Sequence, residues 1–301
     1  MMKFTEHRAT RRAASKKIVV LYHAECTDGF VAAWAAFRHF GKKAEYHAVE
    51  HQYPMPEKLT GKEVYTLDFT YPEDITRALM ADNERVTSID HHVSVADVTR
   101  MTVGGVYDND HSGAMLSWKY FHPDVPAPLL VRIVEDYDLH RFSLPETRTI
   151  MDFLDLYDFE FTTYTKLARM LDRPMGLRRG LRTGGIVSLY RERAVRSLMG
   201  NSTYEVQFDE HKAGAINTEF YHAEIATLLA EKYHVGIAWR VRPHGTYVSL
   251  RSDGTVNVAD LASRYGGGGH ARSAGFVVAS PSHLPFQQAA GEQTDAPNNE
   301  R

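Results

Sequence analysis

Histidine and aspartate residues gather in four short segments of this sequence. The segments are His23 with Asp28, Asp68, Asp90-His91-His92, and Asp136 with Asp138. Carboxylates placed close together repel one another and raise each other's pKa, and a divalent cation removes that cost. Mixed Asp oxygen and His nitrogen ligands suit Mn²⁺, and less selectively Fe, Co or Zn, whereas an all-oxygen site suits Mg²⁺ better. Two such metals about 3.5–4 Å apart bridge a phosphate, activate water and stabilise the leaving oxygen.

Each segment also has an ordinary structural interpretation. Asp68 alone is typical of a turn or a helix N-cap, Asp90-His91-His92 of a polar loop, and His23 of a satisfied core residue. All four, however, fall just after predicted strands or in nearby turns. In open parallel sheets ligands bind beyond the carboxyl ends of the strands, so the shared position favours one metal site.

Strands alternate with helices through the first half of the chain. A continuous apolar run predicts a strand over residues 18–22, further strands are predicted over 63–67 and 86–89, and 104–107 is a candidate for a short one. Helical spacing predicts helices over 30–40, 73–81 and 112–120. Residues 129–137, 149–171 and 186–199 are predicted to be mainly helical. The pattern predicts an α/β fold, with an N-terminal, largely parallel sheet flanked by helices.

The character changes after Gly200-Asn201-Ser202, a break signal. Strands are predicted over residues 204–208, 212–216, 235–242, 247–252 and 275–278, and helices over 222–233 and 258–265, which together form a smaller α+β domain. The predicted organisation is a flexible arm (1–16), a catalytic domain (17–185), a linker helix (186–203), a substrate-binding domain (204–282) and a tail (283–301). The tail is rich in Gln, Glu, Asn, Pro and Ala and is predicted to be disordered.

These motifs resemble the DHH phosphoesterase superfamily, which is named for an Asp-His-His motif after a strand. The resemblance covers roughly residues 17–280, and its four motifs begin at Tyr22, Thr66, Ile89 and Glu135. A glycine-rich segment, Tyr265 to Gly275, resembles the signature of the DHH-associated C-terminal domain. Four consecutive glycines let a backbone approach a phosphate or base with its N–H groups free.

The resemblance implies a role for each residue of the site. His23, Asp28 and Asp68 would hold one metal, and Asp68 would bridge to a second metal held by His91 and one aspartate of the fourth motif. That aspartate is expected to be Asp138, because Asp-x-x-x-Phe resembles the family spacing, with Asp136 as the alternative or as an outer-shell partner. Asp90 would orient an imidazole, and His92 would contact the scissile phosphate. The expected cofactor is a pair of Mn²⁺ ions, with Mg²⁺, Co²⁺ or Fe²⁺ as alternatives.

The first motif departs from the family pattern. Many members carry two aspartates two positions apart, whereas Phe30 stands two positions after Asp28. Glu25 or a water would then complete the coordination, or the second metal would bind more weakly. The motif resembles a branch of the family whose first motif reads Cys-x-Asp-Gly-Phe.

Substrate contacts are predicted in both domains. Ser112 would meet a phosphate through a helix start, with a plain helix cap as the alternative. Further candidates for binding a phosphate or base lie in the second domain, where the arginines are suited to forked phosphate contacts. These candidates are Arg251, Gly267, Gly268, Gly269, His270 and Arg272. Arg251 has the alternative of a surface residue on an edge strand.

Charge and composition limit the partners and the cellular environment that the sequence predicts. A net charge of −3 argues against holding a long duplex by charge alone. The single cysteine, Cys26, excludes an intrachain disulfide and fits a reducing cytoplasm, and the apolar run at residues 18–22 is too short to span a membrane. The sequence is compatible with a homodimer.

The sequence therefore predicts a metal-dependent phosphodiesterase that cuts short oligonucleotides or dinucleotides to mononucleotides. Cyclic dinucleotides, a phosphoadenosine-phosphate nucleotide or pyrophosphate are alternative substrates. A non-catalytic sensor of nucleotide or metal is the alternative from another class of protein.

Overall fold

The computed structural model describes residues 17–49 and 59–288, so the predicted arm (1–16) and residues 289–301 of the tail lie outside it. The chain divides into two compact units, residues 1–188 and 189–301. Within the described ranges no helix is both long and apolar enough to cross a membrane.

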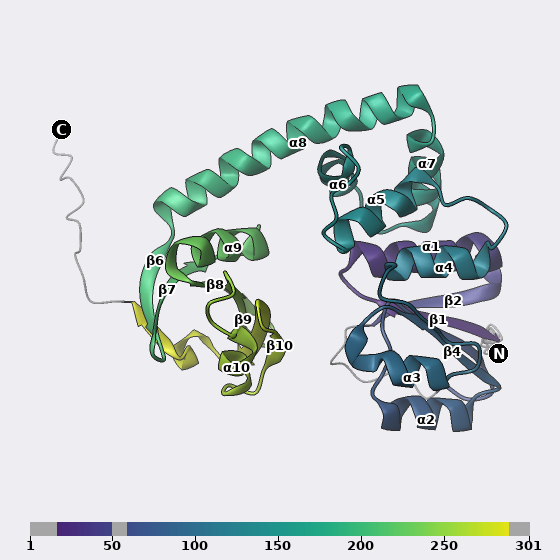
Figure 1. Cartoon of the computed structure of the whole chain (residues 1–301), viewed down its shortest axis with the longest axis horizontal. Coiled ribbons are helices and arrows are strands. Elements are labelled where there is room, and N and C mark those ends of the chain that lie inside the picture. The colour runs from purple at the N-terminus through teal and green to yellow at the C-terminus, as the bar shows by residue number, and fades with distance from the viewer. Residues whose placement is uncertain (1–16, 50–58, 289–301) are drawn as a thin grey trace, which may run out of the picture. The chain divides into compact units, whose positions relative to one another are not determined.

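The first unit is built on a parallel sheet of five strands in the order β2-β1-β3-β4-β5. The strands are β1 (Ile18–His23), β2 (Ala44–Val49), β3 (Glu63–Leu67), β4 (Arg85–Asp90) and β5 (Val106–Tyr107). Helices α1 (Thr27–Phe40) and α4 (Gly113–Phe121) cover one face, and α2 (Glu73–Asp82) and α3 (Ala96–Met101) cover the other (Figure 1). The predicted α/β class with a parallel sheet is confirmed.

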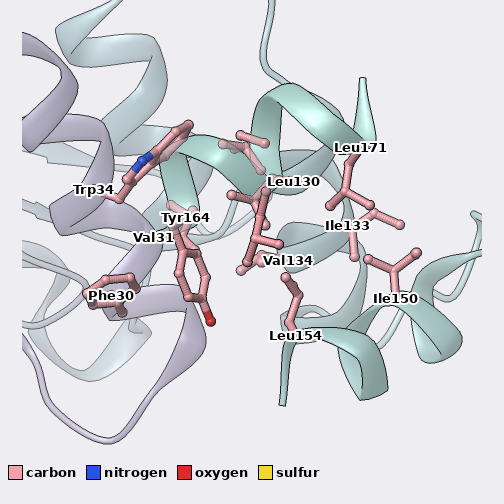
Figure 2. Packing of buried hydrophobic residues seen from close by; sticks show 14 of the residues in the cluster. Phe30, Val31, Trp34, Leu130, Ile133, Val134, Ile150, Leu154, Tyr164 and Leu171 are labelled. Atoms are coloured by element: carbon pink, nitrogen blue, oxygen red, sulfur yellow. The ribbon is translucent and has the colours of Figure 1, made fainter. Parts of the chain in front are cut away.

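A second helical layer packs on α1 and α4. It contains α5 (Leu129–Asp138), α6 (Thr147–Leu154) and α7 (Phe161–Leu171). Its core holds Phe30, Trp34, Leu130, Ile150 and Tyr164, which point into one cluster (Figure 2). The prediction of helix across 149–171 is wrong at residues 155–160, where the chain leaves the helix and re-enters at Phe161.

The 28-residue helix α8 (Pro174–Asn201) begins well before the predicted linker, and the boundary between the two units falls inside it. Short 3-10 helices lie at Gly41–Lys43, Val93–Val95 and Pro281–His283. Strand β2 and helix α3 were not predicted.

The second unit holds a mixed sheet of seven strands in the order β10-β11-β9-β8-β7-β6-β12. The strands are β6 (Tyr204–Phe208), β7 (His211–Asn217), β8 (Val235–Arg242), β9 (Gly245–Ser252), β10 (Gly268–His270), β11 (Ser273–Val278) and β12 (Phe286–Gln288). Helix α9 (His222–Tyr233) packs against the sheet through Ile225 and Leu229, and α10 (Val258–Ser263) packs in a separate cluster through Val258 and Leu261.

The start of the predicted disordered tail is ordered. Strand β12 pairs antiparallel with β6, and Phe286 is buried at 8% exposure, with its ring 5.9 Å from that of Phe208. Residues 283–301 are polar on average, but they include Phe286, which packs in the core beside β6. The prediction of disorder is therefore wrong for residues 286–288.

Candidate metal centre

Three neighbouring strands end at the same edge of the first sheet. Tyr22 pairs with Leu67, and Leu67 pairs with Ile89, so the residues that follow them lie side by side. His23 closes β1, Asp68 directly follows β3, and Asp90 closes β4. Parallel pairing in this register is what brings the first three sequence motifs together.

Asp68 lies between two imidazoles. Its Oδ2 is 3.4 Å from His23 Nδ1, and its Oδ1 is 3.3 Å from His91 Nε2. His91 Nε2 is also 3.7 Å from Asp138 Oδ2. The ligand atoms fall into three sets, each within 4.8 Å: His23, Cys26 and Asp68; Asp68, His91 and His92; and Asp28, His91 and Asp138.

Two of these carboxylates are deeply buried. Asp28 is 2% exposed and Asp68 1%, and within the described ranges Asp28 Oδ2 and Asp68 Oδ1 have no hydrogen-bond partner. Burial raises the pKa of Asp28 well above its usual value, and the carboxylates of Asp68 and Asp138 raise it further. Burial acts to raise the pKa of Asp68 as well, but the neighbouring imidazoles of His23 and His91 outweigh it and lower that pKa. Buried, unpaired oxygens beside imidazoles fit a divalent cation.

Two glycines bring helix starts against these carboxylates. A Cβ at Gly113, the first residue of α4, would lie 2.6 Å from Asp68 Cβ and 2.9 Å from Asp28 Oδ2. A Cβ at Gly29 would lie 2.4 Å from the carbonyl oxygen of His23. The backbone N–H of Ala114 donates to Asp28 Oδ1 at 3.1 Å. The close packing at these two glycines was not predicted, because it arises only where α1 and α4 meet the strand ends.

Ser112 lies at the start of α4, as predicted, and is its N-cap residue. Its side chain is buried and accepts a hydrogen bond from Met115 N at 3.4 Å, so it caps the helix. This is the helix-cap alternative, and a substrate contact through Ser112 stays a prediction.

Asp90 contacts the imidazole ring of His92, whereas it meets His91 only through the backbone N–H. The carboxylate is fully buried, and its Oδ1 lies 2.8 Å from His92 Nδ1 and accepts from the backbone N–H of His91 at 2.7 Å. This hydrogen bond raises the pKa of His92 to about 9. The contact with Asp90 therefore favours the protonated form of His92 in the metal-free protein, and the His92 side chain is half-exposed at the site.

Asp136 and Asp138 lie in different surroundings. Asp136 is 4% exposed, and its two oxygens accept hydrogen bonds from Ser143, Leu144 and Thr147. It belongs to none of the three sets, whereas Asp138 lies beside His91. The geometry favours Asp138 over Asp136 as a ligand.

Neither Phe30 nor Glu25 belongs to the three sets of possible metal ligands. Phe30 is 1% exposed and stacks on Phe159 and Phe161 in the helical core. Glu25 is exposed and belongs to none of the three sets. Sequence reasoning instead overlooked Cys26, which lies within one of them.

The predicted substrate residues of the second unit lie on or near strands β9, β10 and β11. Arg251 in β9 pairs with Ser273 and is half-buried, so it is not an edge-strand surface residue. Gly267 and Gly269 pack tightly against β11, where a Cβ would lie 2.1 Å and 2.5 Å from backbone oxygens, while Gly268 has open space around it. His270 is exposed at the end of β10, and the guanidinium of Arg272 packs against Gly254.

A comparison with family models identifies a domain in the second unit. The DHHA1 domain model matches residues 221–293, which span most of the second unit, and the Asp-His-His motif stands at the end of β4 in the first. Together these findings support the DHH phosphoesterase superfamily. They support a metal-dependent phosphoesterase of the DHH kind.

Two relatives and one solved structure illustrate the similarity. Uncharacterized protein R106 of Acanthamoeba polyphaga mimivirus is 22% identical over 300 residues, which is 90% of this chain and 70% of that protein. Oligoribonuclease NrnB of Bacillus subtilis (strain 168) is 31% identical over 80 residues, but the match covers 23% of this chain and 18% of that protein. The pGpG-specific phosphodiesterase PggH of Vibrio cholerae has a TM-score of 0.48 at 14% identity, covering 88% of this chain and 94% of that one, and the assignment does not rest on it.

Proposed function

We propose that this chain hydrolyses the phosphodiester bonds of short oligonucleotides to release mononucleotides, using two divalent metals. The observation that carries the proposal is that Asp68 belongs to two overlapping sets of ligand atoms. A carboxylate shared in this way is what a bridged pair of metals requires.

His23 and Asp68 would hold one metal, and Asp68, His91 and Asp138 the other. Asp28 was expected beside His23, but its ligand atom gathers with His91 and Asp138, and we place it with the second metal. When bound, the metals activate water and neutralise charge on the phosphate. Mn²⁺ is the expected ion, and Mg²⁺, Co²⁺ and Fe²⁺ are the alternatives.

The protein's own groups complete the chemistry. Asp90 fixes the His92 ring and keeps it protonated, so that a positive imidazole faces the scissile phosphate and stabilises charge that develops there. Gly113 and Gly29 let two helix N-termini approach the carboxylates. Ser112 supports this arrangement by capping α4.

The second unit would bind the nucleotide. Arg251 and Arg272 supply guanidinium groups for phosphate, and Gly267 to His270 supply backbone N–H groups and an imidazole. The DHHA1 match in this unit and the name of the Bacillus relative, an oligoribonuclease, favour short oligonucleotides over pyrophosphate. A cytoplasmic location and a homodimer stay predictions.

The test is hydrolysis of a 5′-labelled RNA dinucleotide with added Mn²⁺. We expect release of mononucleotide and a loss of at least about 100-fold in His91→Ala, because even outer-shell partners of a metal contribute about 10–100-fold. His244→Ala is the matched control, since His244 lies in an exposed turn of the second unit. Turnover of cyclic dinucleotide or of phosphoadenosine phosphate in place of the dinucleotide would change the substrate, and metal binding without any turnover would favour the sensor.

A further inference from the structure

Cys26 is the only cysteine of the chain and lies beside the metal centre. It is the N-cap residue of α1, and its side chain makes no capping hydrogen bond. Its sulfur gathers with a His23 nitrogen and an Asp68 oxygen within 4.8 Å. Three donors of different softness therefore converge on one point.

The turn between β1 and α1 creates this convergence. The chain leaves β1 at His23, Glu25 takes a positive φ of 53°, and α1 begins at Thr27. This tight reversal exposes Glu25 and returns Cys26 to the strand end. The side chain that accompanies His23 is therefore the thiol and not the carboxylate of Glu25.

A second observation points to a ligand at the same place. Asp68 is 1% exposed, and its Oδ2 lies 3.4 Å from His23 Nδ1, a member of the same set. Its Oδ1, on the side of His91, has no hydrogen-bond partner among the described residues. A buried carboxylate oxygen without a donor costs free energy unless a cation or a donor meets it. The carboxylate of this set is therefore buried, with one oxygen on His23 and the other satisfied by no described donor.

We propose that Cys26 is a thiolate ligand of the metal held by His23 and Asp68. On binding, a sulfur–metal bond forms and the thiol proton passes to solvent. A site with one nitrogen, one carboxylate oxygen and one thiolate favours Zn²⁺, Co²⁺ or Fe²⁺ and disfavours Mg²⁺, because thiolate is a soft ligand. The inference rests on the proposed metal centre and adds that this position prefers softer metals than its neighbour.

The experiment is a Co²⁺ titration of the full-length protein, followed by absorption in the near ultraviolet. A thiolate bound to cobalt produces a sulfur-to-cobalt charge-transfer band, and Cys26 is the sole thiol that can produce it. We expect the band to grow with bound Co²⁺ and to be absent in Cys26→Ser and Cys26→Asp. Both replacements are good N-cap residues, so α1 should still begin normally, which circular dichroism of the metal-free proteins checks.

The two variants separate the ligand role from a merely structural one. Cys26→Ser should weaken Co²⁺ binding by more than about tenfold, since even outer-shell partners contribute about 10–100-fold. Cys26→Asp should retain Mn²⁺ binding and shift the ratio of Co²⁺ to Mn²⁺ affinity toward Mn²⁺. These affinities are measured by calorimetry, independently of hydrolysis.

The outcomes distinguish this inference from the proposed function. Stoichiometric Co²⁺ binding without a charge-transfer band overturns the thiolate ligand and leaves the metal centre intact. Unchanged Co²⁺ affinity in Cys26→Ser also overturns it. Failure of the wild-type protein to bind any Co²⁺ or Mn²⁺ overturns both proposals.

Discussion

Replacing Asp136 by Asn should destabilise the first unit and leave metal binding unchanged. Burial alone would raise the pKa of Asp136, but hydrogen bonds from Ser143, Thr147 and Leu144 outweigh it and lower the pKa to about 2. The difference from the ordinary value of 3.8 corresponds to about 2.5 kcal/mol, at about 1.36 kcal/mol per pKa unit. Asparagine keeps the shape but removes the charge, and its NH₂ group faces donors, so we expect a loss of at least this size.

The pH dependence has a definite sign. A carboxyl group with a lowered pKa stabilises the folded state above its unfolded pKa, and that stabilisation is lost as the pH falls toward the folded pKa. The charge-dependent part of the difference between wild type and Asp136→Asn should therefore be complete at pH 7, fall to about half near pH 3 and nearly vanish near pH 2.

The assay is urea denaturation followed by tryptophan fluorescence. Trp34 and Trp118 stack in the core of the first unit, 5.5 Å apart, while Trp239 lies in the second. A Trp239→Phe background makes the signal report the first unit alone, which matters because a chain of two units need not unfold in one step.

Asp138→Asn is the matched control, two positions along the same helix. Burial and the carboxylate of Asp68 raise the pKa of Asp138, so loss of its charge should leave the metal-free protein equally stable or more stable. It should weaken Mn²⁺ binding by at least about tenfold. Loss of metal at unchanged stability in Asp136→Asn, or destabilisation by Asp138→Asn instead, would refute these two assignments.

Three further perturbations test the packing around the site. Gly113→Ala places a Cβ 2.7 Å from Asp68 Oδ1, so Mn²⁺ affinity by calorimetry should fall by at least about tenfold in a folded protein, and unchanged affinity would contradict the close approach of α4. Gly184→Ala drives a Cβ to 2.0 Å from a backbone oxygen and should lower the urea midpoint, whereas Gly185→Ala in the same helix meets open space and should raise stability by up to about 1 kcal/mol; equal effects would refute the close packing of α8 at Gly184. Phe286→Ala should cost about 3 kcal/mol in thermal or urea unfolding of the second unit, and no loss would mean that β12 does not pack on the core.

Local pattern was sufficient for much of the fold. The continuous apolar run at 18–22 predicted β1 because a strand covered on both faces has no polar side to interrupt it. Residues 63–67, rich in strand-forming Val, Tyr and Thr, predicted β3. Helix α9 has the predicted bounds, 222–233. Strand β2 was missed because it lies at the sheet edge, where polar residues such as Glu45 and His47 alternate with apolar ones.

Long-range contacts decided what local pattern could not. Residues 286–288 look polar on average, and only the free edge of β6 and the core beside Phe208 make them a strand. The break at 155–160 likewise follows from stacking of Phe159 and Phe161 on Phe30, which is far away in the sequence.

The sequence by itself determined the α/β class, and it predicted the two-part organisation and the donor types of the site, because residue type and position after a strand are local properties. The tertiary structure alone decided which donors meet. It separated Asp136, saturated by its own turn, from Asp138 beside His91. It also turned Glu25 outward, placed Cys26 beside His23 and Asp68, and required glycine where α4 meets the carboxylates. The direction of a side chain depends on the path of the backbone around it, and that path is set by the packing of helices on a sheet.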